Sequence, residues 1–135
     1  MLIPRMLKRK WGRIVHISSI SAIDGGPTLK PYGGSPPYSA AKAYLNTYIK
    51  SLGKELAKNN IVVTGIMPGA ILAKGKHWER MKKKNPLLVN QYLKNNYAIN
   101  RFAQPKEIAP FAVFLASQQA SFASTSILSL DGGKL

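Results

Sequence analysis

The chain has 135 residues, enough for one ordinary domain, and 45% of them are apolar, so a packed core is expected. Twenty Lys and Arg against five Asp and Glu give a formal net charge of +15, and the absence of cysteine excludes disulfides, thiolate zinc sites and cysteine nucleophiles. The sequence contains neither an apolar run of membrane-spanning length nor a signal peptide, so we expect a cytoplasmic protein without a membrane partner.

The positive charge gathers in two clusters, at residues 5–13 and 74–84. Such a surface is compatible with a nucleic-acid partner. However, no zinc-finger, helix-turn-helix or RNA-recognition signature accompanies the clusters, and Lys50, Lys54 and Lys58 recur every four residues, as on a solvated helix face. We therefore expect a basic surface near an anionic substrate or a phosphate-bearing cofactor, and not a nucleic-acid partner.

Strand and loop patterns alternate at the start of the chain. Residues 2–10 have the pattern of a basic amphipathic helix, which Gly12 breaks. The apolar, β-branched run 13–17 predicts a buried strand that ends at Ser18 and Ser19. Residues 21–37 are rich in Gly, Pro and Ser and predict a loop.

A long helix is predicted from there to about Lys58, with Ser35 as its N-cap and Pro36 or Pro37 in its first turn. Its apolar residues follow helical spacing: Ala41, Tyr44, Leu45, Tyr48, Leu52 and Leu56. Residues 61–66 predict a second buried strand, which closes at Met67-Pro68-Gly69. A strand, a long helix and a strand form a βαβ unit, which implies a parallel sheet with a right-handed crossover.

The remaining elements complete an alternating α/β pattern. Residues 73–100 predict two short helices broken at Asn85-Pro86, and Pro105 begins another helix with Glu107 in its first turn. That helix is expected to turn these residues inward: Ile108, Phe111, Ala112, Phe114 and Leu115. Residues 126–130 predict a third strand, which ends in Asp131-Gly132-Gly133, a turn that pins the C-terminus.

Tyr38 and Lys42 are the residues most informative about function. Residues four apart lie on the same face of a helix, and an ammonium group beside a phenol favours the phenolate. Such a tyrosine can exchange a proton with an alcohol or carbonyl oxygen. A serine from the end of the upstream strand could hold the same oxygen, so the three groups together indicate interconversion of a carbonyl and an alcohol.

The order of five segments resembles the short-chain dehydrogenase/reductase family. They are GRIVHISS, YSAAK, MPGAI, RFAQPKEIAPFAVFLAS and LSLDGG, and together they cover nearly the whole chain. The resemblance implies the C-terminal portion of a doubly wound, three-layer α/β/α Rossmann-like domain. It also implies an oxidoreductase that transfers a hydride between NAD or NADP and a small carbonyl or alcohol substrate.

The resemblance also assigns roles to residues. Tyr38 is the catalytic acid/base, and Ser19 binds the substrate oxygen, with Ser18 and Ser21 as competing candidates. Lys42 supports Tyr38 and holds the nicotinamide ribose. The turn with Pro68, Gly69 and Ile71 meets the nicotinamide. Residues 73–100 form the substrate loop, and the helix over 39–58 pairs with its copy in a homo-oligomer.

The sequence departs from the family pattern at several points. The glycine-rich cofactor-binding half and the catalytic asparagine have no counterpart, so residues 1–135 are expected to form a single, partial domain, inactive alone and a weak cofactor binder. Ser19 and Tyr38 are separated by more residues than the family pattern has, and Ala73 replaces a frequent hydroxyl residue. These departures leave open an alternative: a non-catalytic basic module that binds an anionic partner.

The remaining candidate residues have modest expected roles. His16 is expected to be a satisfied core residue and His77 a solvated loop residue that could line a pocket. No further His, Asp or Glu has metal-ligand spacing with either, so no metal is expected. For Trp78, Tyr92 and Tyr97, packing within a lid and contact with substrate remain equal alternatives.

Overall fold

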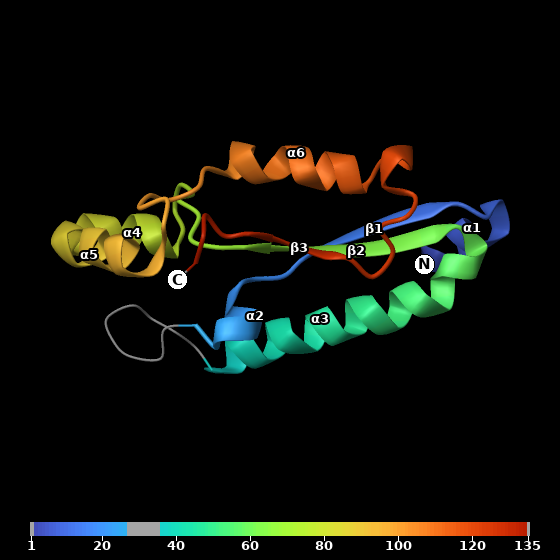
Figure 1. Cartoon of the computed structure of the whole chain (residues 1–135), viewed down its shortest axis with the longest axis horizontal. Coiled ribbons are helices and arrows are strands. Elements are labelled where there is room, and N and C mark those ends of the chain that lie inside the picture. Colours follow the sequence, from blue (N-terminus) through green and yellow to red (C-terminus); the bar gives the residue numbers. More distant parts are fainter. Residues whose placement is uncertain (1, 27–35, 135) are drawn as a thin grey trace.

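A computed structural model describes residues 2–26 and 36–134. Three parallel strands form one sheet in the order β1 (Gly12–Ile17), β2 (Ile61–Pro68), β3 (Ile127–Leu130). Helix α6 (Pro105–Leu115) covers one face of the sheet, and α3 (Pro36–Leu56) covers the other face (Figure 1). The predicted three-layer α/β/α arrangement with a parallel sheet is therefore confirmed.

The central strand explains why the sheet is parallel. All eight residues of β2 are buried, as expected for a strand with neighbours on both edges and helices on both faces. The register pairs Gly12 with Ile61 and Ile17 with Ile66 on one edge, and Gly65 with Ile127 on the other. All three strands run in the same direction, so their carboxyl ends lie at the same end of the sheet.

Two apolar clusters hold the helices to the sheet. On the α3 side, Ile49 and Leu56 pack with Ile61 and Val63. On the α6 side, Leu115 packs with Ile66 and with Ala120 of the short 3₁₀ turn η2 (Gln118–Ala120). Because β2 supplies buried residues to both clusters, this strand connects the two layers.

The buried face of helix α3 differs from the face predicted by helical spacing. Leu45, Leu52 and Leu56 do pack toward the sheet, but Tyr44 is 72% exposed, Tyr48 is largely outside the core, and Ile49 is the fully buried residue. Ala41 is exposed as well. The helix ends at Leu56, two residues before the predicted Lys58, and continues as the 3₁₀ turn η1 (Ala57–Asn59).

The predicted inward face of α6 is wrong at two aromatic residues. Leu115 is buried and Ile108 and Ala112 pack against the core, but Phe111 and Phe114 are 41% and 48% exposed. The short helix covers only three strands, so its apolar surface is wider than the face that the sheet buries. The two phenylalanines remain available to a further protein surface.

The predicted loop over 21–37 contains a short helix, α2 (Ser21–Asp24), which residues 18–20 connect to the end of β1. Backbone hydrogen bonds from Ala22 and Asp24 to Ser19 and Ile20 form its single turn. The predicted N-cap Ser35 and the central part of the loop lie outside the described residues. Pro36 and Pro37 do stand in the first turn of α3, as predicted.

The predicted pair of helices between 73 and 100 is confirmed as α4 (His77–Lys84) and α5 (Pro86–Asn96). The Asn85 side chain accepts a hydrogen bond from the Leu88 amide, so the break is also the N-cap of α5. Both helices lie beyond the carboxyl ends of the strands (Figure 1).

The N-terminal helix α1 (Ile3–Arg9) lies at the opposite end of the sheet. In the described part of the chain, no helix has the length and hydropathy needed to cross a membrane.

A charge-dependent stabilisation is expected at the start of α6. Glu107 accepts the Gln104 amide at 2.8 Å and pairs with Arg101 through two contacts of 2.8 and 2.9 Å. The hydrogen bond from Arg101, followed by that from the Gln104 backbone, lowers the pKa of Glu107 to about 2. A lowered carboxyl pKa stabilises the fold above the unfolded-state pKa, and this stabilisation is lost as pH falls toward 2.

We therefore expect Glu107→Gln to lower the melting temperature at pH 6, and the difference from wild type to shrink as pH falls from 5 toward 2. Glutamine keeps the cap acceptor but removes the ion pair. Glu107→Ala removes both and should be less stable than Glu107→Gln across this range. A difference between wild type and Glu107→Gln that does not change with pH would contradict the assignment. Thermal unfolding followed by circular dichroism measures both variants.

Candidate functional site

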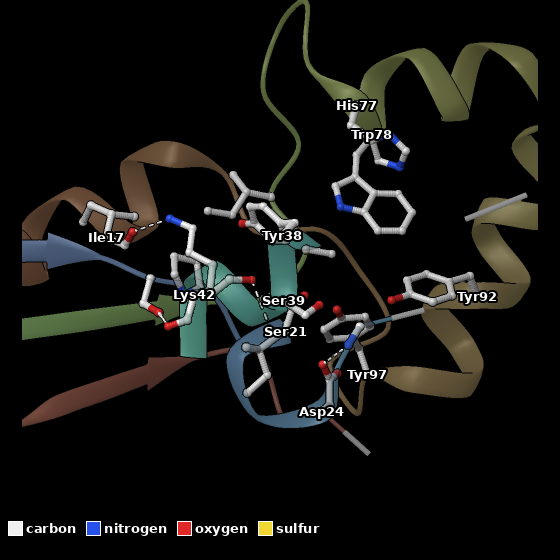
Figure 2. Close-up of a pocket in the computed structure, with 18 residues that line it drawn as sticks. Ile17, Ser21, Asp24, Tyr38, Ser39, Lys42, His77, Trp78, Tyr92 and Tyr97 are labelled. Atoms are coloured by element: carbon white, nitrogen blue, oxygen red, sulfur yellow. Dashed lines mark hydrogen bonds between the residues drawn. The ribbon is translucent and has the colours of Figure 1, made fainter. Parts of the chain in front are cut away.

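A cavity of about 590 Å³ opens at the carboxyl ends of the strands. Its walls come from the end of β1, from α2, from the first turns of α3, from the turn after β2, and from α4 and α5 (Figure 2). All six residues predicted as site residues line this cavity: Ser19, Tyr38, Lys42, Pro68, Gly69 and Ile71. In open parallel sheets, ligands bind at this end of the strands.

Tyr38 and Lys42 lie on the cavity side of the first turns of α3. The Lys42 ammonium is 5.7 Å from the centroid of the Tyr38 ring and donates a hydrogen bond of 2.8 Å to the Ile17 carbonyl at the end of β1 (Figure 2). Tyr38 itself is 48% exposed. The helix therefore fixes both groups on one face, and the strand end holds the lysine in place.

The three candidate serines have different surroundings. Ser18 is buried, and its hydroxyl donates to the Lys42 backbone carbonyl at 3.3 Å, so it helps to fix α3 against β1. The Ser19 hydroxyl accepts the Ser21 amide at 3.2 Å, which leaves its own proton for another acceptor. Ser21 also lines the cavity. This geometry favours Ser19 over Ser18 as the donor to a bound oxygen.

The turn after β2 connects two parts of the fold. The Gly69 amide donates to the Leu130 carbonyl of β3, and the Pro68 carbonyl accepts the Ile20 amide. Ile71 forms an isolated parallel bridge with Ala103. In this bridge the Ala103 amide donates to the Ala70 carbonyl, and the Ala103 carbonyl accepts from the Leu72 amide. The N–H and C=O of Ile71 itself therefore point away from Ala103, and Ile71 lines the cavity.

Gly69 stands where no side chain fits. A Cβ atom there would lie 2.9 Å from the Asp131 Cα atom and 3.0 Å from Cε1 of Tyr97, and backbone atoms cannot move aside as a flexible side chain can. We expect Gly69→Ala to lower the free energy of unfolding by about 1–3 kcal/mol through this overpacking. Urea denaturation measures the loss. Gly75→Ala is the comparison, since a Cβ there meets open space.

At Gly75 the φ angle is +73°, so alanine is strained there even without a contact. A Gly69→Ala loss no greater than that of Gly75→Ala would contradict the close approach of the turn to Asp131. Activity of the Gly69→Ala protein below its unfolding transition reports separately on the shape of the turn.

Aromatic side chains close the wall formed by α4 and α5. Trp78 stacks on Tyr92 with ring centroids 5.0 Å apart, and its ring lies 5.2 Å from that of His77. Tyr97 is buried beside Tyr92, and this burial raises the pKa of Tyr97 well above its usual value, so its phenol stays neutral. The three aromatics therefore both pack together and line the cavity. His77, predicted to be a solvated loop residue, is the exposed first residue of α4 and also lines it.

Two polar side chains that line the cavity, those of Asp24 and Ser39, were not among the sequence-based candidates. Asp24 ends α2, accepts the Gly26 amide at 2.7 Å and forms an ion pair of 3.6 Å with Lys134. The Ser39 hydroxyl donates to the Gly25 carbonyl at 2.6 Å. The available signal for Asp24 was its place five residues after Ser19 in a chain with few acids, but the partner near the C-terminus was invisible in the sequence.

His16 does not belong to this cavity. Its ring meets that of Tyr48 edge-on at 5.9 Å, and its Nε2 atom is buried without a hydrogen-bond partner among the described residues. The prediction of a satisfied core histidine is therefore wrong for this atom. Burial lowers the pKa of His16, which keeps the ring neutral. Within residues 2–26 and 36–134, no group of three His, Cys, Asp or Glu side chains could hold a metal ion.

Comparisons with known proteins identify the family. The family described as enoyl-(acyl carrier protein) reductase matches residues 1–134. The 3-oxoacyl-[acyl-carrier-protein] reductase FabG of Chlamydia trachomatis is 38% identical over 128 residues, which are 95% of this chain and 47% of that protein. The chain thus spans about half the length of the curated relatives it matches.

Two solved structures show the same fold. The 3-oxoacyl-(acyl-carrier-protein) reductase of Agrobacterium tumefaciens with NADP bound has a TM-score of 0.85 at 28% identity, over 97% of this chain and 48% of that one. The L-sorbose reductase of Gluconobacter frateurii with NADPH and L-sorbose has a TM-score of 0.81 at 36% identity, over 99% of this chain and 51% of that one. The chain belongs to the short-chain dehydrogenase/reductase family, and its fold corresponds to about half of the Rossmann-fold domain of these relatives.

Proposed function

We propose that this chain forms the catalytic part of an NAD(P)-dependent oxidoreductase that interconverts a carbonyl and an alcohol. The observation that carries the proposal is that Tyr38 and Lys42 of α3, and Ser19 of the segment after β1, line one cavity at the carboxyl ends of the strands. The family relatives named above include NADP- and NADPH-bound reductases, which agrees with this chemistry.

The residues of the cavity fit a nicotinamide nucleotide. The carboxamide of the nicotinamide ring can accept a hydrogen bond at its oxygen and donate one from its nitrogen. The backbone N–H and C=O of Ile71 are both left unused by the bridge to Ala103 and can supply these two partners. The Lys42 ammonium has donors beyond the one that it gives to Ile17, and these suit ribose hydroxyls. When bound, the nicotinamide supplies or accepts the hydride. The cofactor is NAD or NADP, since solved relatives include the L-sorbose reductase with NADPH and a 4-hydroxyisoleucine dehydrogenase with NADH.

The side chains of this chain handle the proton. In the reduction direction, Ser19 donates a hydrogen bond to the carbonyl oxygen and so increases the positive character of its carbon. The Tyr38 phenol gives its proton to the same oxygen as negative charge develops there, and Lys42 stabilises the phenolate that results. In the oxidation direction, the phenolate takes the proton from the alcohol. Residues 73–100, with α4 and α5, form the substrate side of the cavity.

We also propose that α3, within residues 39–58, pairs with its copy in a second subunit. Tyr44 and Tyr48 stack on each other at 6.3 Å on the outer face of the helix, where Tyr44 is 72% exposed. Exposed stacked tyrosines are typical of interfaces more than of solvated helices. Sedimentation of the wild type and of Tyr44→Glu tests this pairing.

The function is tested with the full-length protein. Oxidation of NADH and NADPH is followed by absorbance with a panel of ketones, sugars and acyl thioesters as carbonyl substrates. Turnover with at least one carbonyl, lost on removal of the Tyr38 hydroxyl, supports the proposal. Cofactor binding without any turnover across the panel, or turnover that does not depend on Tyr38, would overturn it.

A further inference from the structure

The charge of the cavity contrasts with the charge of the chain. The net charge is +15, yet the described residues that line the cavity include a single lysine, Lys42, which the proposed reaction already uses, and no arginine. The other full charge in the lining is the carboxylate of Asp24. The next cation among the described residues, Lys134, is already paired with Asp24 at 3.6 Å and donates to Asn96 at 3.3 Å, so a substrate with a carboxylate or phosphate would have to compete with the Asp24 carboxylate for it.

Asp24 has capacity for more hydrogen bonds than it makes. A carboxylate offers about four acceptor positions. One oxygen accepts the Gly26 amide at 2.7 Å, and the other is 3.6 Å from the Lys134 ammonium, while 28% of the side chain stays exposed. Hydroxyl groups are the natural further partners of such a carboxylate, and two adjacent hydroxyls can bind it together.

Trp78 supplies a different kind of contact on the opposite side of the cavity (Figure 2). Tyr92 and Phe102 pack against the indole, with ring centroids at 5.0 and 5.4 Å from its own. A ring fixed in this way presents an apolar, electron-rich surface. The C–H groups of a polyhydroxylated carbon chain carry partial positive charge and pack on such a surface, while the hydroxyls turn to the other wall.

We propose that the substrate is a neutral, polyhydroxylated ketone or the corresponding polyol, held by Asp24 through its hydroxyls and by Trp78 through its carbon chain. This inference rests on the proposed function and adds the substrate class to it. The neighbouring hydroxyls of Ser21 and Ser39 extend the polar wall on the Asp24 side. The basic cluster at residues 74–84 is then a surface feature and not the anion site that the charge alone suggested.

The test compares three probes in the full-length protein: L-sorbose, a neutral ketohexose; 5-keto-D-gluconate, which carries a carboxylate; and an acetoacetyl thioester, which lacks hydroxyls. We expect kcat/KM for the ketohexose to be highest. Asp24→Asn should lower it by about 10- to 100-fold, mainly through KM, since a hydrogen bond to a charged acceptor is weakened. In the same variant, kcat/KM for the thioester should stay within about twofold of wild type. The ratio of kcat/KM for the ketoacid to that for the ketohexose should rise.

Two controls separate substrate contact from structure. Lys134→Met removes the ion pair with Asp24 but keeps the carboxylate, so it should preserve the ketohexose preference; an equal loss in Lys134→Met and Asp24→Asn would assign Asp24 a structural role and overturn the proposal. Trp78→Leu should raise KM for the ketohexose, whereas Trp11→Leu, far from the cavity, should not.

The results distinguish this inference from the proposed function. Wild-type protein that prefers the ketoacid or the thioester, with turnover that still depends on Tyr38, overturns the substrate class alone. Turnover that survives Tyr38→Phe overturns the proposed function instead. Saturation-transfer NMR with the Tyr38→Phe protein and cofactor detects binding of L-sorbose without turnover. This binding signal should disappear in the Tyr38→Phe/Asp24→Asn double variant.

Discussion

Replacing Tyr38 by phenylalanine in the full-length protein is expected to lower kcat by about 10²–10⁴-fold, the range that a positioned general acid contributes. The substitution removes one hydroxyl from a side chain that is 48% exposed at the cavity, and it keeps the ring beside which the Lys42 ammonium lies. KM for the carbonyl should change little, because in the proposed reaction Ser19 still donates to the carbonyl oxygen. Steady-state kinetics with the best carbonyl of the panel measures both constants.

Tyr44→Phe is the matched control for this prediction. Tyr44 lies on the same helix and also loses a single hydroxyl, but it is 72% exposed and stacks on Tyr48 instead of lining the cavity. Its kcat should stay within about twofold of wild type, and its ring remains at the proposed subunit contact. Equal losses in the two variants would show that Tyr38 acts through the helix or the assembly and not through its phenol.

Elements with strong local signals could be predicted from the sequence. The β-branched runs before Ser18 and Met67 predicted two strands, and the long helix between them required a parallel pairing, as the sheet shows. The second strand is buried as predicted, whereas the prediction of burial is wrong for residues 13–17, which are only partly buried and end at Ile17, 50% exposed. The place of Tyr38 and Lys42 on a common face followed from helical spacing alone, which depends on no tertiary contact. These local rules were enough to bring the predicted site residues to one cavity.

What could not be predicted depends on contacts between distant segments. The exposure of Phe111 and Phe114 is set by how much of α6 the three strands cover, which the helical pattern does not contain. The one-turn helix α2 lies in a stretch whose composition is typical of a loop. It begins at Ser21, directly after the Ile20 amide donates a hydrogen bond to the Pro68 carbonyl of β2, a contact that the sequence does not contain. Asp24 meets Lys134 only because the C-terminal turn returns to the cavity.

The largest expected loss of stability comes from Ile49→Ala. Ile49 is fully buried in α3, and a Cβ atom added at Gly65 of β2 would lie 2.8 Å from its Cδ1 atom, so the helix and the central strand approach each other closely here. Truncation leaves a cavity between two elements that cannot easily close it. We expect the free energy of unfolding to fall by about 2–5 kcal/mol, measured by urea denaturation of the full-length protein.

This magnitude is a large part of the 5–15 kcal/mol that holds an ordinary domain folded, so the variant should also expose α3 to proteolysis. Lys50→Ala, at the adjacent exposed position, should change stability by no more than about 0.5 kcal/mol. A loss below 1 kcal/mol for Ile49→Ala would mean that α3 does not pack on β2 as described. Below its unfolding transition, Ile49→Ala should keep the kcat of the wild type, because Ile49 supports the helix at a distance from Tyr38 and touches neither substrate nor cofactor.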